Sequence, residues 1–147
     1  CKFYGKIRRV AMAKVIFCLV AENIINDSSN SLISVVNLVE KIEGQALPAV
    51  RPLLYFFVYW KKEGPIAAAE KFTFRIRVKR PDGSYLDNPH EEITEEIPAG
   101  KDRLRFISKM EDIPLQEEGD LEFVVEQKSE GGGWSRKANF PVTIALQ

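Results

Sequence analysis

The chain has 147 residues, 45% of them hydrophobic and 29% charged, and its 21 basic side chains balance its 21 acidic ones. This length fits one domain with a single substantial core. The zero net charge argues against a dedicated nucleic-acid binder, which normally carries a basic excess, and it leaves little long-range repulsion to oppose self-association. No apolar run approaches the roughly 20 residues that a membrane-spanning helix needs.

The N-terminal segment stands apart from the rest of the chain. It begins with Cys1 and has neither the strand pattern nor the turn signals that follow Met12. We therefore expect residues 1–11 to be a non-native or upstream leader and residues 12–147 to form a single β-sandwich domain. In the alternative interpretation Cys1 is the lipidated first residue of a bacterial lipoprotein, although the basic and partly apolar Lys2–Val10 does not resemble a polar tether.

A hairpin is predicted at the start of the domain. Lys14–Glu22 is apolar on both faces, which is typical of a buried strand. Asn26–Asn30 is a cluster of short polar residues that favours a turn. The β-branched residues of Leu32–Ile42 predict the second strand of the hairpin, and Gly44–Arg51 is predicted to be a loop.

The most apolar stretch of the chain is Leu53–Trp60, whose aromatic residues and valine favour a strand over a helix. The stretch has no alternation of apolar and polar residues, which predicts that both of its faces are buried and that the other segments supply the cover. Pro52 is predicted to mark its start, and Lys61–Pro65 its end.

Turns and strands alternate through the middle of the chain. Ile66–Glu70 has the composition of a single helical turn. Phe72–Lys79 alternates strictly between apolar and polar residues, as a half-exposed strand does. Pro81–Ser84 is a strong turn signal, and Glu91–Ile97 fits either an acidic edge strand or a short helix.

Three more strands are predicted toward the C-terminus, at Arg103–Met110, Leu121–Lys128 and Phe140–Leu146. A loop over Pro114–Asp120 and a Gly-rich tip over Ser129–Ser135 separate them. About eight short strands with no convincing helix predict an all-β protein, built as an antiparallel two-sheet sandwich.

Three stretches carry a resemblance to known sequences. They are the opening strand with Cys18 and Glu22, the strand Ser31–Val36, and the turn Arg80–Gly83. In these features the chain, from about Met12 onward, resembles an uncharacterised domain family of small bacterial proteins. The resemblance implies an immunoglobulin- or C2-like sandwich, and it implies no functional residues because the shared features are turn and packing signals.

The sequence contains one histidine, His90, which limits the catalytic sites that it could build. A nucleophilic triad would need His90 beside Cys18 or a serine, with an acid to orient it. Cys18 lies in an apolar strand, His90 lies in a polar loop, and no Gly-x-Ser-x-Gly pattern is present. We therefore expect no catalytic residue, no cofactor, and a free buried Cys18 rather than a disulfide with Cys1.

Calcium binding through loop aspartates, as in C2-type domains, needs several oxygen atoms that converge. The aspartates of this chain are scattered and form no Asp-x-Asp pair, so we expect no metal site; they are Asp27, Asp82, Asp87, Asp102, Asp112 and Asp120. Four glutamates are expected to form an exposed edge that discourages strand addition; they are Glu91, Glu92, Glu95 and Glu96.

Trp134 and Arg136 are the first candidate binding residues. Trp134 lies within the Gly-rich tip Ser129–Ser135, where an exposed aromatic ring would anchor a partner at low entropic cost. In the alternative interpretation Trp134 folds back as a lid over the core, and the tip has no binding role.

Arg75 and Arg77 are the second pair of candidate residues, because they lie on the polar face of the alternating strand. This face would dock phosphate, anionic lipid or an acidic partner. We expect three further cations to extend it, Lys61, Lys62 and Arg80. In the alternative interpretation Glu122 and Glu126 pair with these cations across strands, and the face is simply solvated.

The function predicted from these features is that of a non-enzymatic binding or scaffold module in the bacterial cytoplasm. We expect a protein partner and consider a homodimer, and we expect neither a nucleic-acid partner nor a membrane span. The alternatives are a small hydrolase or transferase, and a C2-like domain that binds an anionic ligand or lipid.

The leader hypothesis generates a first prediction. A chain that starts at Met12 should melt at the same temperature as the full sequence, because residues 1–11 lack the patterns of the domain. Calorimetry on both proteins checks this, and failure of the shortened chain to fold would show that the segment is a strand or an anchor.

Overall fold

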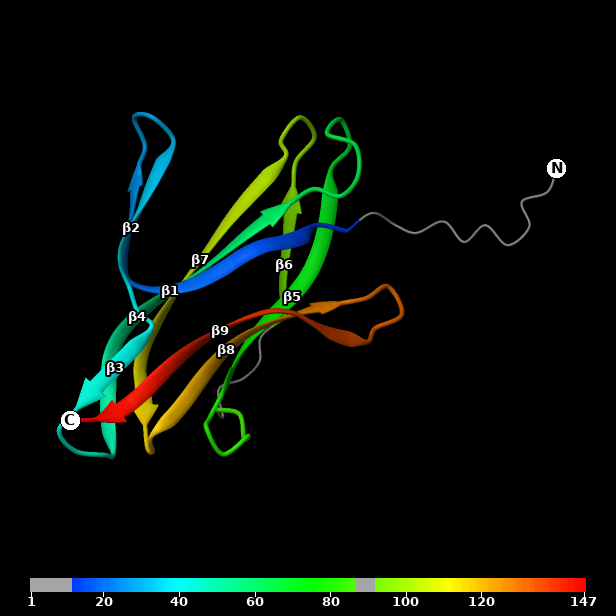
Figure 1. Cartoon of the computed structure of the whole chain (residues 1–147). Coiled ribbons are helices and arrows are strands. Elements are labelled where there is room, and N and C mark those ends of the chain that lie inside the picture. Colours follow the sequence, from blue (N-terminus) through cyan, green and yellow to red (C-terminus); the bar gives the residue numbers. More distant parts are fainter. Residues whose placement is uncertain (1–11, 87–91) are drawn as a thin grey trace.

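The computed structural model describes residues 12–86 and 92–147, which form nine strands in two sheets packed face to face (Figure 1). One sheet has the strand order β2-β1-β4-β7, and the other has the order β3-β9-β8-β5-β6. Neighbouring strands are antiparallel except β3 and β9, which are parallel. The predicted all-β two-sheet sandwich is therefore confirmed. The strands are β1 (Lys14–Asp27), β2 (Leu32–Leu38), β3 (Lys41–Gly44), β4 (Ala49–Lys61), β5 (Glu70–Lys79), β6 (Ile93–Ile97), β7 (Arg103–Leu115), β8 (Gly119–Lys128) and β9 (Trp134–Leu146).

β4 is the strand on which the core is built, and it lies between β1 and β7. Its inward residues Phe56, Val58 and Trp60 are fully buried between the sheets. The Phe56 ring lies 5.7 Å from that of Phe123, and the Trp60 ring lies 4.6 Å from that of Phe72, measured between centroids. Burial of each such side chain contributes about 1.5–3 kcal/mol, so the two sheets are held together largely through β4.

The outer face of β4 is covered differently from the inner one. Phe56, Phe57 and Val58 are 0%, 2% and 0% exposed, so their predicted burial is confirmed. Phe57 nevertheless points away from the facing sheet and does not belong to the core between the sheets, because successive residues of a strand point to opposite faces. The other sheet therefore covers only the inward face of β4, and the outward face is not part of the core between the sheets.

Two predicted segments fold differently from the expectation, and a third resolves an alternative in favour of the edge strand. Leu32–Ile42 is not one strand, because the chain leaves the four-stranded sheet after β2 and β3 joins the other sheet beside β9. Ile66–Glu70 contains a turn, in which the Ala68 amide donates to the Pro65 carbonyl at 3.1 Å, and no helical turn. The acidic segment 91–97 forms the edge strand β6 in its described part.

β4 and β7 are both longer than predicted, because they continue past a shared irregularity. Pro52 does not start β4, which begins at Ala49. The register skips Pro52, since Arg51 pairs with Ile113 and Leu53 with Glu111. Proline has no amide hydrogen to donate. The residue that the register leaves opposite, Asp112, has a φ of +51°. Beyond this position the two strands pair again up to Leu115, where the sequence predicted a loop.

Lys62 is a structural residue and not part of a basic surface. It is 3% exposed, and its Nζ donates to the carbonyl oxygens of Ile66 and Pro98 at 2.7 and 2.8 Å. A buried ammonium group is costly unless it is hydrogen-bonded in this way. Lys62 therefore holds the β4–β5 connection against the β6–β7 turn, and its assignment to a basic binding face is wrong.

The core generates the second prediction. Phe56→Ala should lower the free energy of unfolding by about 3–5 kcal/mol, because it leaves a cavity between the sheets. The matched control is Phe17→Ala on the neighbouring strand. Phe17 is 43% exposed, so the loss of its ring should cost about 1 kcal/mol or less. Urea unfolding of both variants checks this, and equal losses would contradict the central role of β4.

Candidate functional site

The outer face of the five-stranded sheet contains the residues that the sequence singled out. Trp134 lies in register with Lys128 and starts β9, so it belongs to a strand and not to the tip before it. The guanidinium carbon of Arg75 lies 4.2 Å from the centroid of the Trp134 ring. The ring is half-buried on this outer face, so Trp134 is neither a lid over the core nor a free aromatic tip.

The cations of this face are paired with acids on β8. Arg75 Nε donates to Glu126 Oε1 at 2.7 Å, and Arg77 Nη1 lies 3.5 Å from the same oxygen. Arg136 Nη2 lies 2.9 Å from Glu122 Oε2. The cross-strand pairing considered in the sequence analysis is therefore confirmed. We refer to the outer-face residues Trp134, Arg75, Arg77 and Arg136 as the Trp134 surface.

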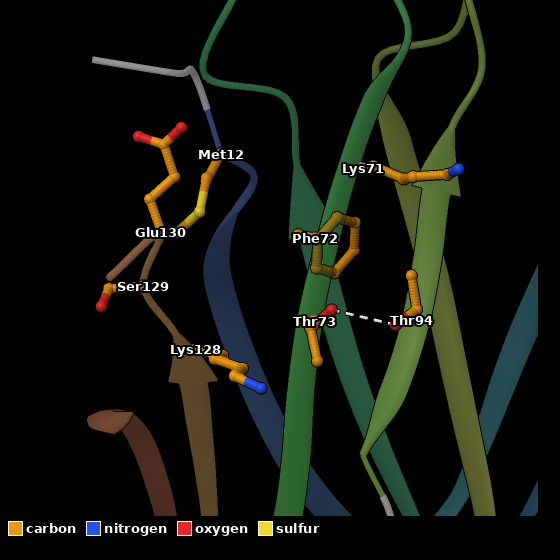
Figure 2. Close-up of a pocket in the computed structure, with 8 residues that line it drawn as sticks. All are labelled: Met12, Lys71, Phe72, Thr73, Thr94, Lys128, Ser129 and Glu130. Atoms are coloured by element: carbon orange, nitrogen blue, oxygen red, sulfur yellow. Dashed lines mark hydrogen bonds between the residues drawn. The ribbon is translucent and has the colours of Figure 1, made fainter. Parts of the chain in front are cut away.

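A hollow of about 200 Å³ adjoins the Trp134 surface, at the end of β5, β6 and β8 (Figure 2). Its polar lining includes Thr73, Thr94 and Lys128. Figure 2 shows the ammonium group of Lys71, another lining residue, pointing away from Thr73 and Lys128. Ser129 and Glu130 also line the hollow, so its polar lining combines hydroxyl groups, a carboxylate and the ammonium group of Lys128.

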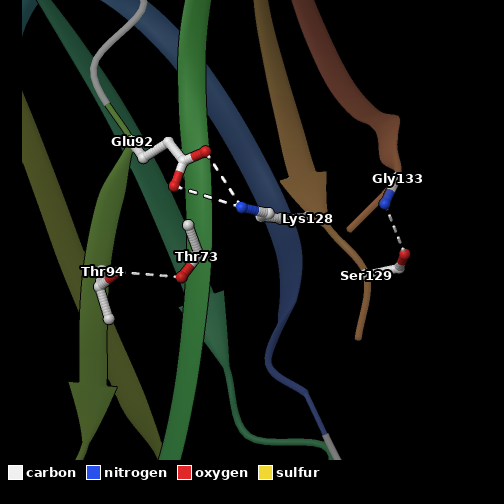
Figure 3. A network of polar contacts seen from close by, with 6 residues as sticks. All are labelled: Thr73, Glu92, Thr94, Lys128, Ser129 and Gly133. Carbon is white, nitrogen blue, oxygen red and sulfur yellow. Dashed lines mark hydrogen bonds and ion pairs between the residues drawn. The ribbon is translucent and has the colours of Figure 1, made fainter. Parts of the chain in front are cut away.

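These polar groups already bind one another (Figure 3). Thr73 Oγ1 and Thr94 Oγ1 are 2.9 Å apart, and Lys128 Nζ contacts both carboxylate oxygens of Glu92 at 3.1 and 3.4 Å. The Ser129 hydroxyl accepts a hydrogen bond from the Gly133 amide at 3.2 Å. Lys128 is therefore neutralised within the protein, and these contacts fix the end of the sheet.

The outer face of the four-stranded sheet contains a cluster that the sequence analysis missed. We refer to Phe17, Leu19, Phe57, Tyr59 and Ile107 as the aromatic face. The Phe17 ring lies 5.7 Å from that of Phe57 and 5.3 Å from that of Tyr59, measured between centroids. Phe17 is 43% exposed and Ile107 is 36% exposed. These side chains are adjacent because Leu19 pairs with Phe57 and Phe57 with Ile107.

Cations border the aromatic face at one end. Lys14 pairs with Lys61 and Lys61 with Arg103, so three cations from β1, β4 and β7 lie in one row; we call them the cationic row. Arg105 follows, opposite Tyr59. Within residues 12–86 and 92–147, no carboxylate forms an ion pair with Lys14, Lys61 or Arg105.

A signal for the aromatic face was present in the sequence. Lys14–Glu22 and Leu53–Trp60 are apolar on both faces, and a two-layer sandwich covers only one face of each strand. The second face of two such neighbouring strands must therefore lie outside, where it forms an apolar surface.

Cys18 is free and half-buried. Burial raises the pKa of its thiol from 9.0 to about 11. The nucleophilic form of cysteine is the thiolate, so the thiol is protonated near neutral pH and is poorly suited to nucleophilic catalysis. The other residue considered for a triad, His90, lies outside the described residues.

A second hollow, of about 640 Å³, lies beside the turn at Pro81–Gly83 and has charges of both signs around it. Asp82 lines it, but its Oδ1 accepts hydrogen bonds from the Ser84 amide and hydroxyl at 2.8 and 2.6 Å. These bonds lower the pKa of Asp82 and serve the turn. No cluster of three metal-binding side chains occurs among the residues that the structure describes.

Comparison with known proteins identifies a family. The model of a family described as "Family of unknown function (DUF6941)" matches residues 16–132. Among solved structures, the chain is similar to a Niemann-Pick type C2 protein from Japanese carpenter ant, at 12% identity and a TM-score of 0.42, over 90% of this chain and 92% of that one. The comparison with curated proteins found no match. The described part of the chain has no helix that is long and apolar enough to cross a membrane.

The environment of Cys18 generates the third prediction. In a Cys1→Ser variant, where Cys18 is the remaining thiol, alkylation by iodoacetamide should be slow near neutral pH and should accelerate in urea. The rate in the folded protein should keep rising as the pH passes 9.0, because the thiolate is populated only toward pH 11. A plateau below pH 9.0 would instead reveal an activated thiol.

Proposed function

The chain belongs to this family of unknown function, and we propose that it is a non-enzymatic binding module that contacts an acidic protein partner through the aromatic face. The observation that carries the proposal is the exposure of Phe17 and Ile107 beside the buried ring of Phe57. Contiguous exposed apolar groups with a polar border mark interaction sites on soluble proteins.

The aromatic face has the composition of a binding hot spot. Rings at its centre, Phe17, Phe57 and Tyr59, are already packed against one another. They would lose little side-chain freedom on binding, which lowers the entropic cost of association. Hot spots are typically such pre-packed aromatic clusters surrounded by polar residues that exclude water.

The cationic row supports an acidic partner. Lys14, Lys61 and Arg105 have no carboxylate partner among the described residues, so acidic groups of a partner would meet unpaired charge. Such complementarity speeds association and selects between partners. A second copy bound face to face about a two-fold axis parallel to the strands would bring these same-sign charges together. This disfavours that homodimer and favours a different, acidic protein.

The Trp134 surface is a second location for the same binding function. The half-buried Trp134 ring supports this location. The guanidinium carbon of Arg75 lies 4.2 Å from the ring centroid, and Lys128 Nζ lies 5.8 Å from it. Against it, Arg75 and Arg136 are paired with Glu126 and Glu122, so binding an acidic partner would require breaking those pairs. We therefore rank the aromatic face first.

The state of Cys18 bears on two further parts of the proposal, the cellular location and the absence of an enzymatic role. A free thiol at Cys18 supports the proposed location in the bacterial cytoplasm, where thiols stay reduced. The protonated state of that thiol favours a binding module over an enzyme with a cysteine nucleophile. Binding of an anionic lipid by the same cations is the competing outcome in the test below.

The proposal generates the fourth prediction. Phe17→Ser should weaken binding of the partner by about 2 kcal/mol, or about 30-fold, with little change in melting temperature because the ring is 43% exposed. A photo-cross-linking side chain at position 17 would identify the partner in cell extract. Calorimetry with the purified partner would then give the dissociation constants of the wild type and the variant.

Trp134→Ala is the matched variant for the second location. If it weakens binding by about 2 kcal/mol at an unchanged melting temperature while Phe17→Ser has no effect, the partner binds the Trp134 surface and the aromatic face is rejected. If Trp134→Ala mainly destabilises the fold, the Trp134 surface is structural. Sedimentation with anionic vesicles tests the lipid alternative, and light scattering tests the homodimer.

A further inference from the structure

β7 has a long free edge. It forms the end of the four-stranded sheet, where it pairs with β4 from Arg103 to Leu115. The described residues include no strand on its other side. Because backbone groups of a strand point alternately to its two neighbours, about half of the amide and carbonyl groups of β7 face away from β4.

The other edge strands are better protected than β7. β2, β3 and β6 have 7, 4 and 5 residues, whereas β7 has 13. Proline and irregular backbone, which discourage strand addition, lie at one end of β7, in Pro114 and in Asp112 with its φ of +51°. The charged side chains elsewhere on β7 are mostly cations, which oppose a basic strand and not an acidic one. The segment Arg103–Glu111 is therefore an uninterrupted edge.

The two faces of this edge differ in chemistry. Its outward side chains are Arg103, Arg105, Ile107, Lys109 and Glu111, which are exposed. Arg103 lies 3.7 Å from Asp102 and Lys109 lies 3.6 Å from Glu111; such exposed pairs contribute little energy and can exchange partners. Its inward side chains Leu104, Phe106 and Met110 pack against the core but remain only half-buried. The edge of the core beside β7 is consequently only partly covered. One more strand next to β7 would cover Leu104, Phe106 and Met110.

We propose that β7 accepts an extended acidic segment of the protein partner as an added strand beside Arg103–Glu111. This inference rests on the proposed binding function and specifies the way in which the partner binds. Acidic residues of the segment would face Arg105, which has no ion pair among the described residues, and would replace Asp102 and Glu111 beside Arg103 and Lys109. The apolar residues between them would cover the half-buried inward side chains. Strand addition supplies affinity through the backbone and selectivity through alternate side chains.

The charges on β7 also select against a second copy of this strand. Two β7 edges paired antiparallel about Ile107 would place Arg105 opposite Lys109 in both halves of the pair, which is destabilising, while Arg103 would lie opposite Glu111. Ile107 is the one apolar residue between Arg105 and Lys109 on the outward face. Like-charge repulsion therefore disfavours pairing with a second copy of β7, whereas it does not oppose pairing with an acidic strand.

The test uses the full chain and a nine-residue probe peptide that alternates glutamate and valine, with an alternating lysine and valine peptide as control. By fluorescence anisotropy the glutamate peptide should bind and the lysine peptide should bind at least about tenfold more weakly. Arg105→Glu should weaken binding of the glutamate peptide by about tenfold or more. Lys41→Glu, which changes a cation on the edge strand β3, should leave it within about twofold.

Two backbone readouts separate strand addition from contact with the sheet face. N-methylation of alternate peptide residues should abolish binding in one register and leave it unchanged in the other, because only one set of amides faces β7. Amides of Arg103–Glu111 that do not pair with β4 should become protected from hydrogen exchange. Equal effects of both N-methyl registers, or unprotected β7 amides, would overturn the inference.

The two proposals fail independently. If the peptide shows no strand signature while Phe17→Ser still weakens binding of the natural partner, strand addition is rejected and the aromatic face stands. If the peptide shows the strand signature and the natural partner ignores Phe17→Ser, the edge stands and the aromatic face is rejected. Absence of binding by peptide and partner alike rejects both.

Discussion

The structure depends on one constraint: β4 is apolar on both faces, and a sandwich of two sheets can cover only one of them. Phe56, Val58 and Trp60 take the inner face and hold the sheets together. Phe57 and Tyr59 are left on the outer face, where Phe17 from β1 packs against both rings. The cluster buries Phe57 but leaves Phe17 exposed, so the strand that stabilises the core also creates the molecule's apolar surface.

Charge distinguishes the two outer faces of the sandwich. On the five-stranded sheet, acids of β8 lie opposite the arginines of β5 and β9, and Arg75 and Arg136 are neutralised by Glu126 and Glu122. On the four-stranded sheet, Lys14, Lys61 and Arg105 meet no such acid among the described residues. Cations that pair within the protein stabilise the fold, whereas unpaired cations beside aromatic rings are available to bind an acidic partner. For this reason we chose the aromatic face as the binding site.

The sequence predicted the candidate site only in part. Arg75 and Trp134 were identified from an alternating strand and a Gly-rich tip, and the structure brings them into contact. The acids that neutralise this surface were named as an alternative, since β-strand alternation places Glu122 and Glu126 on a polar face. Phe17 and Ile107 were missed, because an apolar strand residue looks the same in the sequence whether it points into the core or out of the sheet.

By itself the sequence determined the local features of this protein: the strands of alternating or wholly apolar residues, the turn at Pro81–Ser84, and hence the all-β class. These features depend on side-chain alternation and on turn chemistry, which act over a few residues. The tertiary structure decided which face of β4 is outside, how Leu32–Ile42 divides between two sheets, and that Lys14, Lys61 and Arg103 share a row. Strand order and register set those outcomes, and both arise from pairing between residues far apart in the chain.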